Sequence, residues 1–376
     1  MIIAINTRCL NKDEPGECGN YLSEVFQRIT NLHSGHTFIF LFDKPFKTEI
    51  IFPKNVIPVV TGPQGNTPAK WFIWYNIKIP LLLKKYQADV FVSTGFCSLT
   101  TKVPQCLILH DLSFLYFPSF VKKGHLSFYK TYTPRFLKKA KMIITISNFL
   151  KTGIADRYKI AQEKIQVAYP GINEIYQPVS MEERESVKEQ YAEGNEFFIY
   201  LGEINSRNNI MNLLKAFSAF KKRQKSSMQL LIANEGQDNP DELITKLRSY
   251  KFRNDVKLLT GLSQWGKAKI IASAYAMVYM PFYDEFGTSL LKAMKSEVPV
   301  ITSSTGTMHE ICGDAALYAA PENFKEIAVK MMQIFKDEKL RKEIIEKGRQ
   351  RAKIFSWDNT TEVVWNNIVK TMSTKK

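Results

Sequence analysis

Short runs of β-branched and aromatic residues alternate with longer helical patterns along this chain, and the alternation runs through twice. Such alternation is typical of a parallel sheet whose strands are joined by crossover helices. In the first series, strands are expected at residues 2–5, 37–42, 56–60, 89–93, 105–110, 142–146 and 165–168. Helices are expected between them at residues 20–32, 70–86, 120–139 and 147–158. The first series is therefore predicted to form a complete doubly wound domain.

The second series begins after Pro170, Gly171 and Pro178 with a polar, acid-rich helical pattern, MEERESVKEQYAEGN. Its strands are expected at residues 196–201, 228–233, 256–260, 275–280 and 298–302. Its helices are expected at residues 209–225, 240–250, 263–274 and 288–296. Because open α/β sheets bind ligands beyond the carboxyl ends of their strands, we expect the functional site to lie between two such domains.

Length and composition agree with two globular domains. A chain of 376 residues is longer than one hydrophobic core usually serves, and 45% of its residues are apolar. The five cysteines are scattered without metal-binding spacing, which favours a reducing cytosol. The opening run MIIAINTRCL reads as a first strand rather than a signal peptide, and no stretch is long enough to span a bilayer. A cytoplasmic protein is expected.

The formal net charge of +16 is unevenly distributed. Residues 1–178 hold 22 Lys/Arg and 11 Asp/Glu, whereas residues 179–376 hold 30 and 25. A basic first half predicts an anionic partner, either a membrane surface or an acidic substrate. No nucleic-acid module is recognisable, so nucleic acid is not expected as a partner.

Two segments of the basic half are candidates for membrane contact. The segment 69–87 combines tryptophans with lysines, and either a membrane-surface helix or a core-facing amphipathic helix fits it, the second slightly better. The segment 122–151 has eight Lys/Arg and no acid, which makes it the stronger candidate. A peripheral enzyme that works on a lipid-linked acceptor at the inner face of the membrane would use such a surface.

Several motifs resemble glycosyltransferase family 4. The run VYMPFYDEFGTSLLKAMKSEVPVITSSTGTMHEICGDAALYAAP is similar to the signature region of that family, and IYLGEINSRNNIMNLLKAFSAF to its G-R-x-x-x-x-K-N segment. In the first half, ILHDLSFLYFP resembles the H-D element, and ITISNFLKTGIADRYKIAQEKIQVAYPGI the I-x-V-S-x-F to P-x-G-V stretch. The terminal FSWDNTTEVVWNNI resembles the helix that returns to the first domain.

The resemblance implies a GT-B architecture and a retaining transferase. Residues 1–178 would be a Rossmann-like acceptor-binding domain, residues 179–354 a Rossmann-like nucleotide-sugar-binding domain, and residues 355–376 a helix that packs back on the first domain. The donor would be a nucleotide sugar, bound as a substrate. Neither a metal nor another cofactor is implied.

The leaving diphosphate needs stabilisation, which a helix N-terminus can supply. The helix that begins near Thr288 and Ser289, after Phe286 and Gly287, stands where the resemblance places this site. A capped helix after a loop is the structural alternative for that segment.

The basic side chains of the donor site depart from the family pattern. Where the resemblance implies the phosphate-binding arginine the chain has Glu203, and where it implies the lysine it has Asn208. Arg207 remains as one cation. It could bind phosphate or simply be a solvated residue at the start of a helix.

The paired carboxylates of the family also differ here. Asp284 occupies the position that contacts donor-sugar hydroxyls, and Lys292 occupies the position of the glutamate that clamps the ribose hydroxyls. A lysine cannot accept hydrogen bonds from hydroxyls. Because an expected cation has become Glu203 and an expected anion has become Lys292, we hypothesise that these two side chains approach one another.

The resemblance assigns catalytic roles to Asp284 and to His110, which would contact donor sugar and phosphate. For His110 a structural role at a strand end is an equally good interpretation. Gly16 and Gly19 fall in the loop EPGECGNY, which resembles the glycine-rich turn after the first strand of the family. Two glycines in a loop are a weak signal by themselves.

Two functions of different classes remain open from the sequence. The first is a hexosyltransferase that moves a hexose from a nucleotide sugar to a saccharide or lipid-linked acceptor. The second is a non-catalytic scaffold that keeps the architecture to bind saccharide or to assist an active transferase. A variant of the first is a transferase with an unusual donor, in which Lys292 contacts a phosphate.

Overall fold

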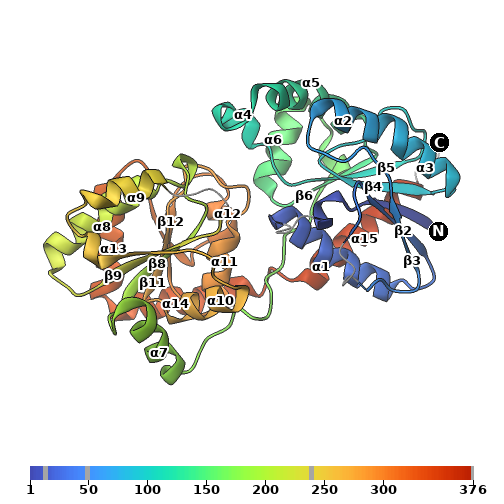
Figure 1. The fold of residues 1–376 in the computed structure, drawn as a ribbon. Coiled ribbons are helices and arrows are strands. Elements are labelled where there is room, and N and C mark those ends of the chain that lie inside the picture. The colour runs from blue at the N-terminus through green and yellow to red at the C-terminus, as the bar shows by residue number, and fades with distance from the viewer. Residues whose placement is uncertain (12–15, 47–50, 237–240, 374–376) are drawn as a thin grey trace. The chain divides into compact units, whose positions relative to one another are not determined.

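The computed structural model describes residues 1–11, 16–46, 51–236 and 241–373 and divides into two compact units (Figure 1). The first unit comprises Met1–Gly171 together with Ser356–Lys376, and the second comprises Ile172–Phe355. Each unit contains one parallel sheet with helices on both faces.

The sheet of the first unit has seven parallel strands in the order β3-β2-β1-β4-β5-β6-β7. Its strands are β1 (Ile2–Asn6), β2 (Thr37–Phe42), β3 (Val56–Val60), β4 (Val90–Thr94), β5 (Gln105–Leu109), β6 (Met142–Thr145) and β7 (Ile165–Val167). The order reverses between β1 and β4, so the segments that follow these two strands leave the sheet toward opposite faces. This reversal is where doubly wound sheets open a crevice.

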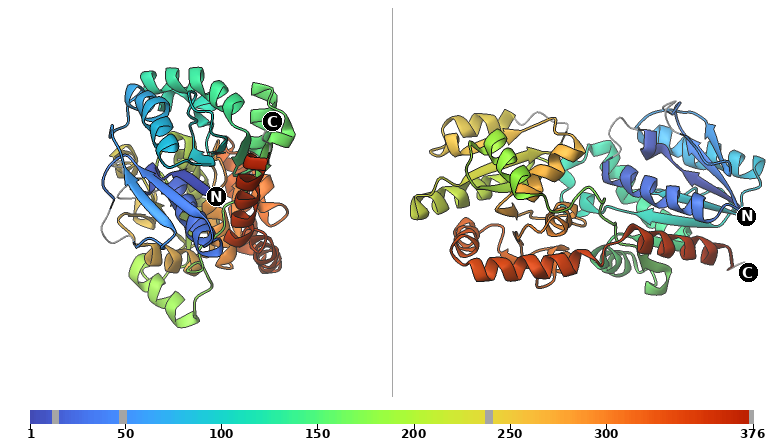
Figure 2. Two further views of the ribbon diagram at one scale, coloured as in Figure 1. Left: turned by 90° about the vertical axis from the view of Figure 1, so that its right-hand side faces the viewer. Right: turned by 90° about the horizontal axis from the view of Figure 1, so that it is seen from below.

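Helices cover both faces of this sheet. They are η1 (Arg8–Asn11), α1 (Gly16–Leu32), α2 (Pro68–Ile73), the π-helical turn η2 (Trp74–Lys78), α3 (Ile79–Lys85), α4 (Ser113–Tyr116), η3 (Pro118–Phe120), α5 (Lys123–Lys139), α6 (Asn148–Tyr158), η4 (Gln162–Lys164) and α15 (Trp357–Ser373). Helices α1 and α15 pack together on one face, and α2 and α5 lie on the other (Figures 1 and 2). The central strands β1, β2, β4, β5 and β6 are therefore buried on both sides, as their nearly continuous apolar sequences require, whereas the edge strand β3 is partly exposed.

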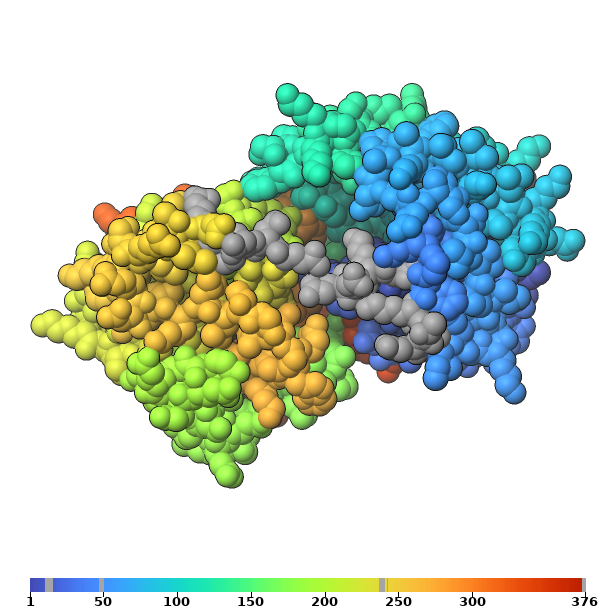
Figure 3. Space-filling model, viewed as in Figure 1, coloured from blue at the N-terminus to red at the C-terminus, as the bar shows by residue number. Residues whose placement is uncertain are grey.

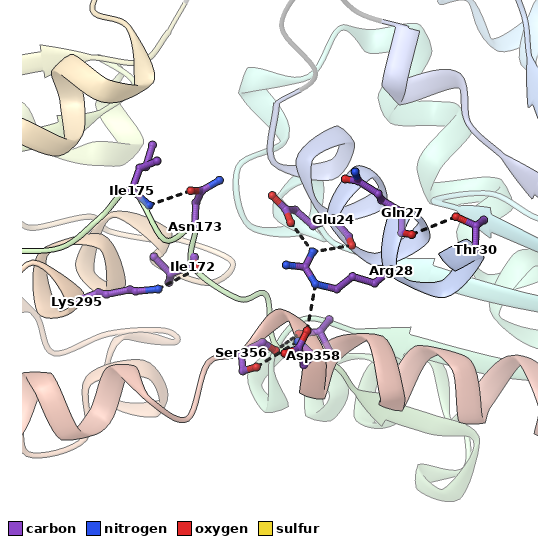
Figure 4. A network of polar contacts seen from close by, with 11 residues as sticks. Glu24, Gln27, Arg28, Thr30, Ile172, Asn173, Ile175, Lys295, Ser356 and Asp358 are labelled. Carbon is purple, nitrogen blue, oxygen red and sulfur yellow. Dashed lines mark hydrogen bonds and ion pairs between the residues drawn. The ribbon is translucent and has the colours of Figure 1, made fainter. Parts of the chain in front are cut away.

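The C-terminal helix α15 belongs to the first unit. Arg28 of α1 pairs with Glu24 one turn earlier at 2.5 Å and with Asp358 at the start of α15 at 3.2 Å (Figure 4). The hydroxyl of Thr360 donates a hydrogen bond to the carbonyl oxygen of Tyr169. A polar contact and an ion pair thus fasten the beginning of α15 to segments that are far earlier in the chain.

The second unit has a six-stranded parallel sheet in the order β10-β9-β8-β11-β12-β13. Its strands are β8 (Phe197–Gly202), β9 (Gln229–Asn234), β10 (Val256–Leu259), β11 (Ala276–Tyr279), β12 (Val300–Ser303) and β13 (Ala316–Ala319). Its helices are α7 (Met181–Ala192), η5 (Ser206–Asn208), α8 (Ile210–Gln224), α9 (Asp241–Arg248), η6 (Arg253–Asp255), α10 (Gln264–Ser273), α11 (Thr288–Lys295), α12 (Met308–Cys312), α13 (Phe324–Lys336) and α14 (Glu338–Ala352). Here the strand order reverses between β8 and β11.

The predicted class, α/β with two Rossmann-like doubly wound units, is confirmed by these sheets. Within the described residues, β13 and the helices α4, α12, α13 and α14 were not among the expected elements. Helix α1 begins at Gly16, whereas the sequence pattern placed its start at residue 20. All five cysteines lie in the described part of the chain and none forms a disulfide, although the thiol of Cys18 lies 3.4 Å from that of Cys9. No described helix combines the length and the apolar character needed to cross a bilayer.

The close approach of Gly171 to α15 gives a first test of the fold. A Cβ atom at Gly171 would lie 2.3 Å from the backbone nitrogen of Trp357, so Gly171→Ala should displace the start of α15. We expect a loss of about 1–3 kcal/mol in the free energy of unfolding, the usual cost of overpacking, measured by urea denaturation. Gly124→Ala is the matched control, because nothing lies within 4 Å of its Cβ position at the start of α5. Equal stability of the two variants would contradict the docking of α15.

Candidate functional site

Acidic side chains gather at the carboxyl end of the second sheet. Glu203 follows β8, Glu235 follows β9, and Asp284 lies in the loop after β11. Burial raises the pKa of the Tyr200 phenol, and the charges of Asp284, Glu203 and Glu235 raise it further. The three carboxylates therefore act on one tyrosine at the point where the strand order reverses, which is the expected ligand edge of such a sheet.

Asp284 holds the loop that leads into α11. Its Oδ1 accepts hydrogen bonds from the backbone nitrogens of Phe286 at 2.8 Å and Gly287 at 2.9 Å, and its Oδ2 accepts one from the Tyr279 hydroxyl at 2.5 Å. Gly287 is the N-cap of α11 with a φ of 82°, a left-handed conformation that favours glycine. The carboxylate is thus held in one orientation by three donors and keeps lone pairs for a further hydroxyl.

Other predicted residues of this loop have different environments. Phe286 is fully buried, its ring meets Phe355 edge to face at 5.8 Å and its backbone N–H donates a hydrogen bond to Asp284, so it supports the loop from inside. Ser289 is buried in the first turn of α11, and Thr288 is half-buried. The backbone at the start of α11, rather than these side chains, is the part that could meet an anion.

The turn after β8 contains three of the predicted residues. Arg207 donates to Glu285 across a part-buried ion pair of 3.1 Å. Asn208 is buried, and its Nδ2 donates to the carbonyl oxygen of Glu203 at 2.9 Å, so it holds the turn closed. The exposed carboxylate of Glu203 accepts a hydrogen bond from Asn205 at 3.1 Å.

Lys292 has a carboxylate partner that differs from the one hypothesised. Its Nζ lies 3.3 Å from Oε1 of Glu235, and Lys267 of α10 lies 3.3 Å from the same oxygen. Lys292 also lies over the ring of Tyr176, 5.5 Å from its centroid. The carboxylate that pairs with Lys292 is therefore Glu235, and the approach of Glu203 to Lys292 stays a prediction.

The first unit has a cavity of about 510 Å³ at the carboxyl ends of β4 and β5. Aromatic rings form much of its wall, contributed by Trp71, Phe96, Phe114, Phe120 and Tyr129. Its polar lining comes from Asn66, His110, Asp111, Lys122 and His125. Helices α2 and α5, which carry Trp71 and Tyr129 of this wall, are in contact, and they lie side by side on the surface of the unit (Figure 3). A second cavity of about 310 Å³ shares Asn66, Trp71 and Phe96 with the first.

His110 lies in the first cavity against Tyr21, with their ring centroids 4.7 Å apart. Its Nε2 is buried and has no hydrogen-bond partner among the residues that the structure describes. Burial lowers the pKa of His110 to about 4, and the neighbouring Asp111 opposes that shift. The imidazole is consequently neutral at pH 7 and can accept or donate one proton.

The glycine-rich segment is partly described. Gly16 begins α1 with a φ of 61°, and Gly19 is buried within the helix rather than in a loop. Residues 14 and 15 of the same predicted loop lie outside the described residues, and residues 17, 18, 20 and 21 belong to α1. The described part of the chain contains no group of three or more His, Cys, Asp or Glu side chains arranged to hold a metal.

Two family descriptions match successive parts of this chain. Glycosyltransferase Family 4 matches residues 26–174, and Glycosyl transferases group 1 matches residues 181–351. The chain belongs to the group 1 glycosyltransferases. Among relatives of this glycosyltransferase, O-antigen chain mannosyltransferase B of Escherichia coli is 26% identical over 67% of this chain and 66% of that protein. O-antigen chain mannosyltransferase RfbU of Salmonella typhimurium is 25% identical over 84% of each.

Solved structures show the same architecture as this glycosyltransferase. Sucrose-phosphate synthase from Thermosynechococcus elongatus has a TM-score of 0.79 with 15% identity, and the match covers 100% of both chains. WaaG, a glycosyltransferase involved in lipopolysaccharide biosynthesis, has a TM-score of 0.75 with 16% identity over 97% of this chain and 99% of its own. The GT-B architecture expected from the motifs is therefore confirmed.

Three residues around Lys292 in this glycosyltransferase were not predicted from the sequence: Tyr176, Glu235 and Lys267. Each belongs to a different segment, and the motif that contains Lys292 includes none of them. The position of Glu235 directly after an expected strand is the one signal that could have identified it, because ligand-binding residues follow strands in this fold.

The neutral state of His110 predicts a pH dependence of stability. The unfolded chain takes up a proton near pH 6.5, whereas the folded imidazole rejects it until about pH 4. Because the unfolded state then binds more protons, the free energy of unfolding should fall as pH decreases from about 6.5 to 4. Chemical denaturation at several pH values should show a flatter dependence in this window for His110→Gln. If nuclear magnetic resonance shows that the His110 imidazole titrates near pH 6.5 in the folded protein, its buried environment is contradicted.

Proposed function

We propose that this glycosyltransferase moves a hexose from a nucleotide-sugar donor to a saccharide or lipid-linked acceptor, with retention of configuration. The observation that carries the proposal is the fixed carboxylate of Asp284 next to the start of α11, at the strand reversal of the second sheet. Charge develops on the leaving diphosphate during transfer, and a helix N-terminus favours that charge. Asp284 would accept hydrogen bonds from donor-sugar hydroxyls.

Roles follow for the other residues in this proposal. The nucleotide sugar is a substrate, and neither a metal nor another cofactor is needed for the steps proposed. The aromatic cavity of the first unit suits a saccharide acceptor, because sugar rings present apolar faces that pack on aromatic side chains. His110, at its polar side, would contact the reacting groups. The names of the two mannosyltransferase relatives make a mannose-bearing nucleotide sugar the first donor to test.

The non-catalytic alternative is supported by the ion pairs of the second unit. Arg207 is paired with Glu285, Lys292 is paired with Glu235, and Asn208 stands where a lysine is implied. A diphosphate must compete with these carboxylates for the cations. A scaffold that keeps only a saccharide-binding cavity would show this pattern too.

Calorimetric titration with UDP, GDP and their sugar conjugates separates the two functions. A transferase should bind at least one of them with a dissociation constant between about 1 μM and 1 mM, the usual range for enzyme substrates. Turnover with that donor should fall about 100-fold in His110→Gln, as expected for loss of a group that handles a proton. His33→Gln, which removes a histidine stacked on Trp365 elsewhere in the unit, is the control. If none of these nucleotides and sugar conjugates binds, the result supports the non-catalytic scaffold.

We further propose that the first unit works at the inner, cytoplasmic face of a membrane. Along α2, η2 and α3, Trp71 and Trp74 are buried, whereas large apolar side chains on the other side are exposed: Phe72 by 43%, Ile73 by 38%, Ile77 by 49% and Leu81 by 61%. Exposed lysines accompany them at positions 70, 78, 84 and 85. The segment 69–87 therefore has a buried face that packs on the core and an exposed face of apolar side chains and lysines. The exposed face fits an anionic lipid surface.

Vesicle sedimentation tests this face. Ile77→Ser with Leu81→Ser should reduce binding to phosphatidylglycerol vesicles several-fold, because less apolar area enters the interface. Ile57→Ser with Val60→Ser on β3 is the matched control, since these side chains are similarly exposed, at 42% and 45%. Binding of the unaltered protein should also weaken with added salt and with neutral phosphatidylcholine vesicles. If the two double variants reduce vesicle binding equally, α2, η2 and α3 do not form the membrane contact.

A further inference from the structure

A part-buried ionic cluster lies at the carboxyl end of β9. Glu235 is its single carboxylate, and both Lys292 and Lys267 lie 3.3 Å from the same oxygen, Oε1. The three side chains keep between 14% and 24% of their exposed area. Holding two lysines and one carboxylate together in this way removes water from all three, so the arrangement has a cost that a function at the site would explain.

The Oε2 atom of Glu235 has no hydrogen-bond partner among the described residues, since both contacts of this side chain go to Oε1. A carboxylate offers about four acceptor positions, of which the lysines use two. Burial would raise the pKa of Glu235, but the charges of Lys292 and Lys267 outweigh burial and lower it. The side chain is therefore an ionised acceptor with capacity left for two hydroxyl donors.

The backbone beside this carboxylate is held in place. The side chain of Asn234 accepts a hydrogen bond from the Gly236 nitrogen at 3.0 Å and donates one to the Gly236 oxygen at 3.3 Å. On the other side of the cluster, Tyr176 covers Lys292 and donates to Gln264 at 3.1 Å. Glu235 is thus presented from a fixed turn, the condition for accepting hydrogen bonds with defined geometry.

We propose that Glu235 accepts the ribose hydroxyls of the donor nucleotide, with Lys292 and Lys267 as positioning residues for its carboxylate. This inference rests on the proposed function. Lys292 stands where the family resemblance implies the ribose-binding glutamate and cannot accept a hydrogen bond, yet it holds a carboxylate 3.3 Å from its own nitrogen. The acceptor has moved from α11 to the end of β9, while the pair of charges remains at the same edge of the sheet.

The test compares binding of UDP with dUDP, and of GDP with dGDP, by titration calorimetry. Removal of the 2′-hydroxyl should weaken binding to the unaltered protein at least about tenfold, as expected for a hydrogen bond to a charged group. In Glu235→Gln the ratio should fall to about threefold or less, because a neutral amide makes a weaker acceptor. The ratio reports the hydroxyl contact itself, so a general loss of affinity does not imitate the result.

Two further variants keep the test decisive. Glu174→Gln removes a carboxylate that pairs with Lys295, one turn from Lys292 on α11, and should leave the ratio unchanged. The double variant Glu235→Lys with Lys292→Glu exchanges the two charges and keeps one carboxylate with two ammonium groups. It should retain the ratio of ribonucleotide to deoxyribonucleotide affinity, and it provides a second measurement if Glu235→Gln folds poorly. Thermal melting establishes that each variant is folded.

The outcomes separate the two proposals. If the unaltered protein binds a ribonucleotide but does not prefer it to the deoxyribonucleotide, or if Glu235→Gln keeps the full preference, the role of Glu235 is overturned and the transferase proposal stands. If no nucleotide binds at all, both are overturned. A preference that depends on Glu235 and survives the exchange supports the assignment.

Discussion

The reversal of strand order in each parallel sheet is the constraint on which the candidate site depends. Crossover connections on the two sides of the reversal leave toward opposite faces, so the segments after the two central strands separate and leave an edge free of covering helix. In the second unit these segments carry Glu203 after β8 and Asp284 after β11. In the first unit β4 and its neighbour β5 lead into the aromatic cavity that contains His110.

Charge compensation shapes the edge of the second unit. Arg207 pairs with Glu285, while Lys267 and Lys292 share Glu235. A part-buried cation without a partner would be strongly disfavoured, so these pairs account for how lysines and arginine are retained beside several acids. They also imply that an anionic ligand must offer interactions at least as good as those of the carboxylates that it displaces. Specificity for a nucleotide then depends on which of these ion pairs the nucleotide can break.

Sequence patterns were most informative where local periodicity reflects burial. Strands at residues 37–42 and 56–60 agree with β2 and β3 to the residue, because β-branched and aromatic residues are enriched in strands. Strand β13 was missed, since two of its four residues, Ala316–Ala319, are alanines, which are depleted in strands. The start of α1 at Gly16 was missed because glycine is a poor helix former, and its left-handed conformation at that end is invisible in the pattern.

The candidate site divides in the same way. His110, Asp284 and the start of α11 were predicted from motifs because the residues of each motif are neighbours in the chain. The ion-pair partner of Lys292, Glu235, was not identified from the sequence, since that contact depends on how β9 and α11 pack in space.

The amino-acid sequence by itself therefore determined the two doubly wound units through local periodicity, while its motifs, by their resemblance to a known family, implied the family and the loss of the usual acceptor at position 292. Tertiary structure alone decided which carboxylate meets Lys292 and which helices wall the cavity around His110. Contacts between segments far apart in the chain leave no periodic trace in the sequence.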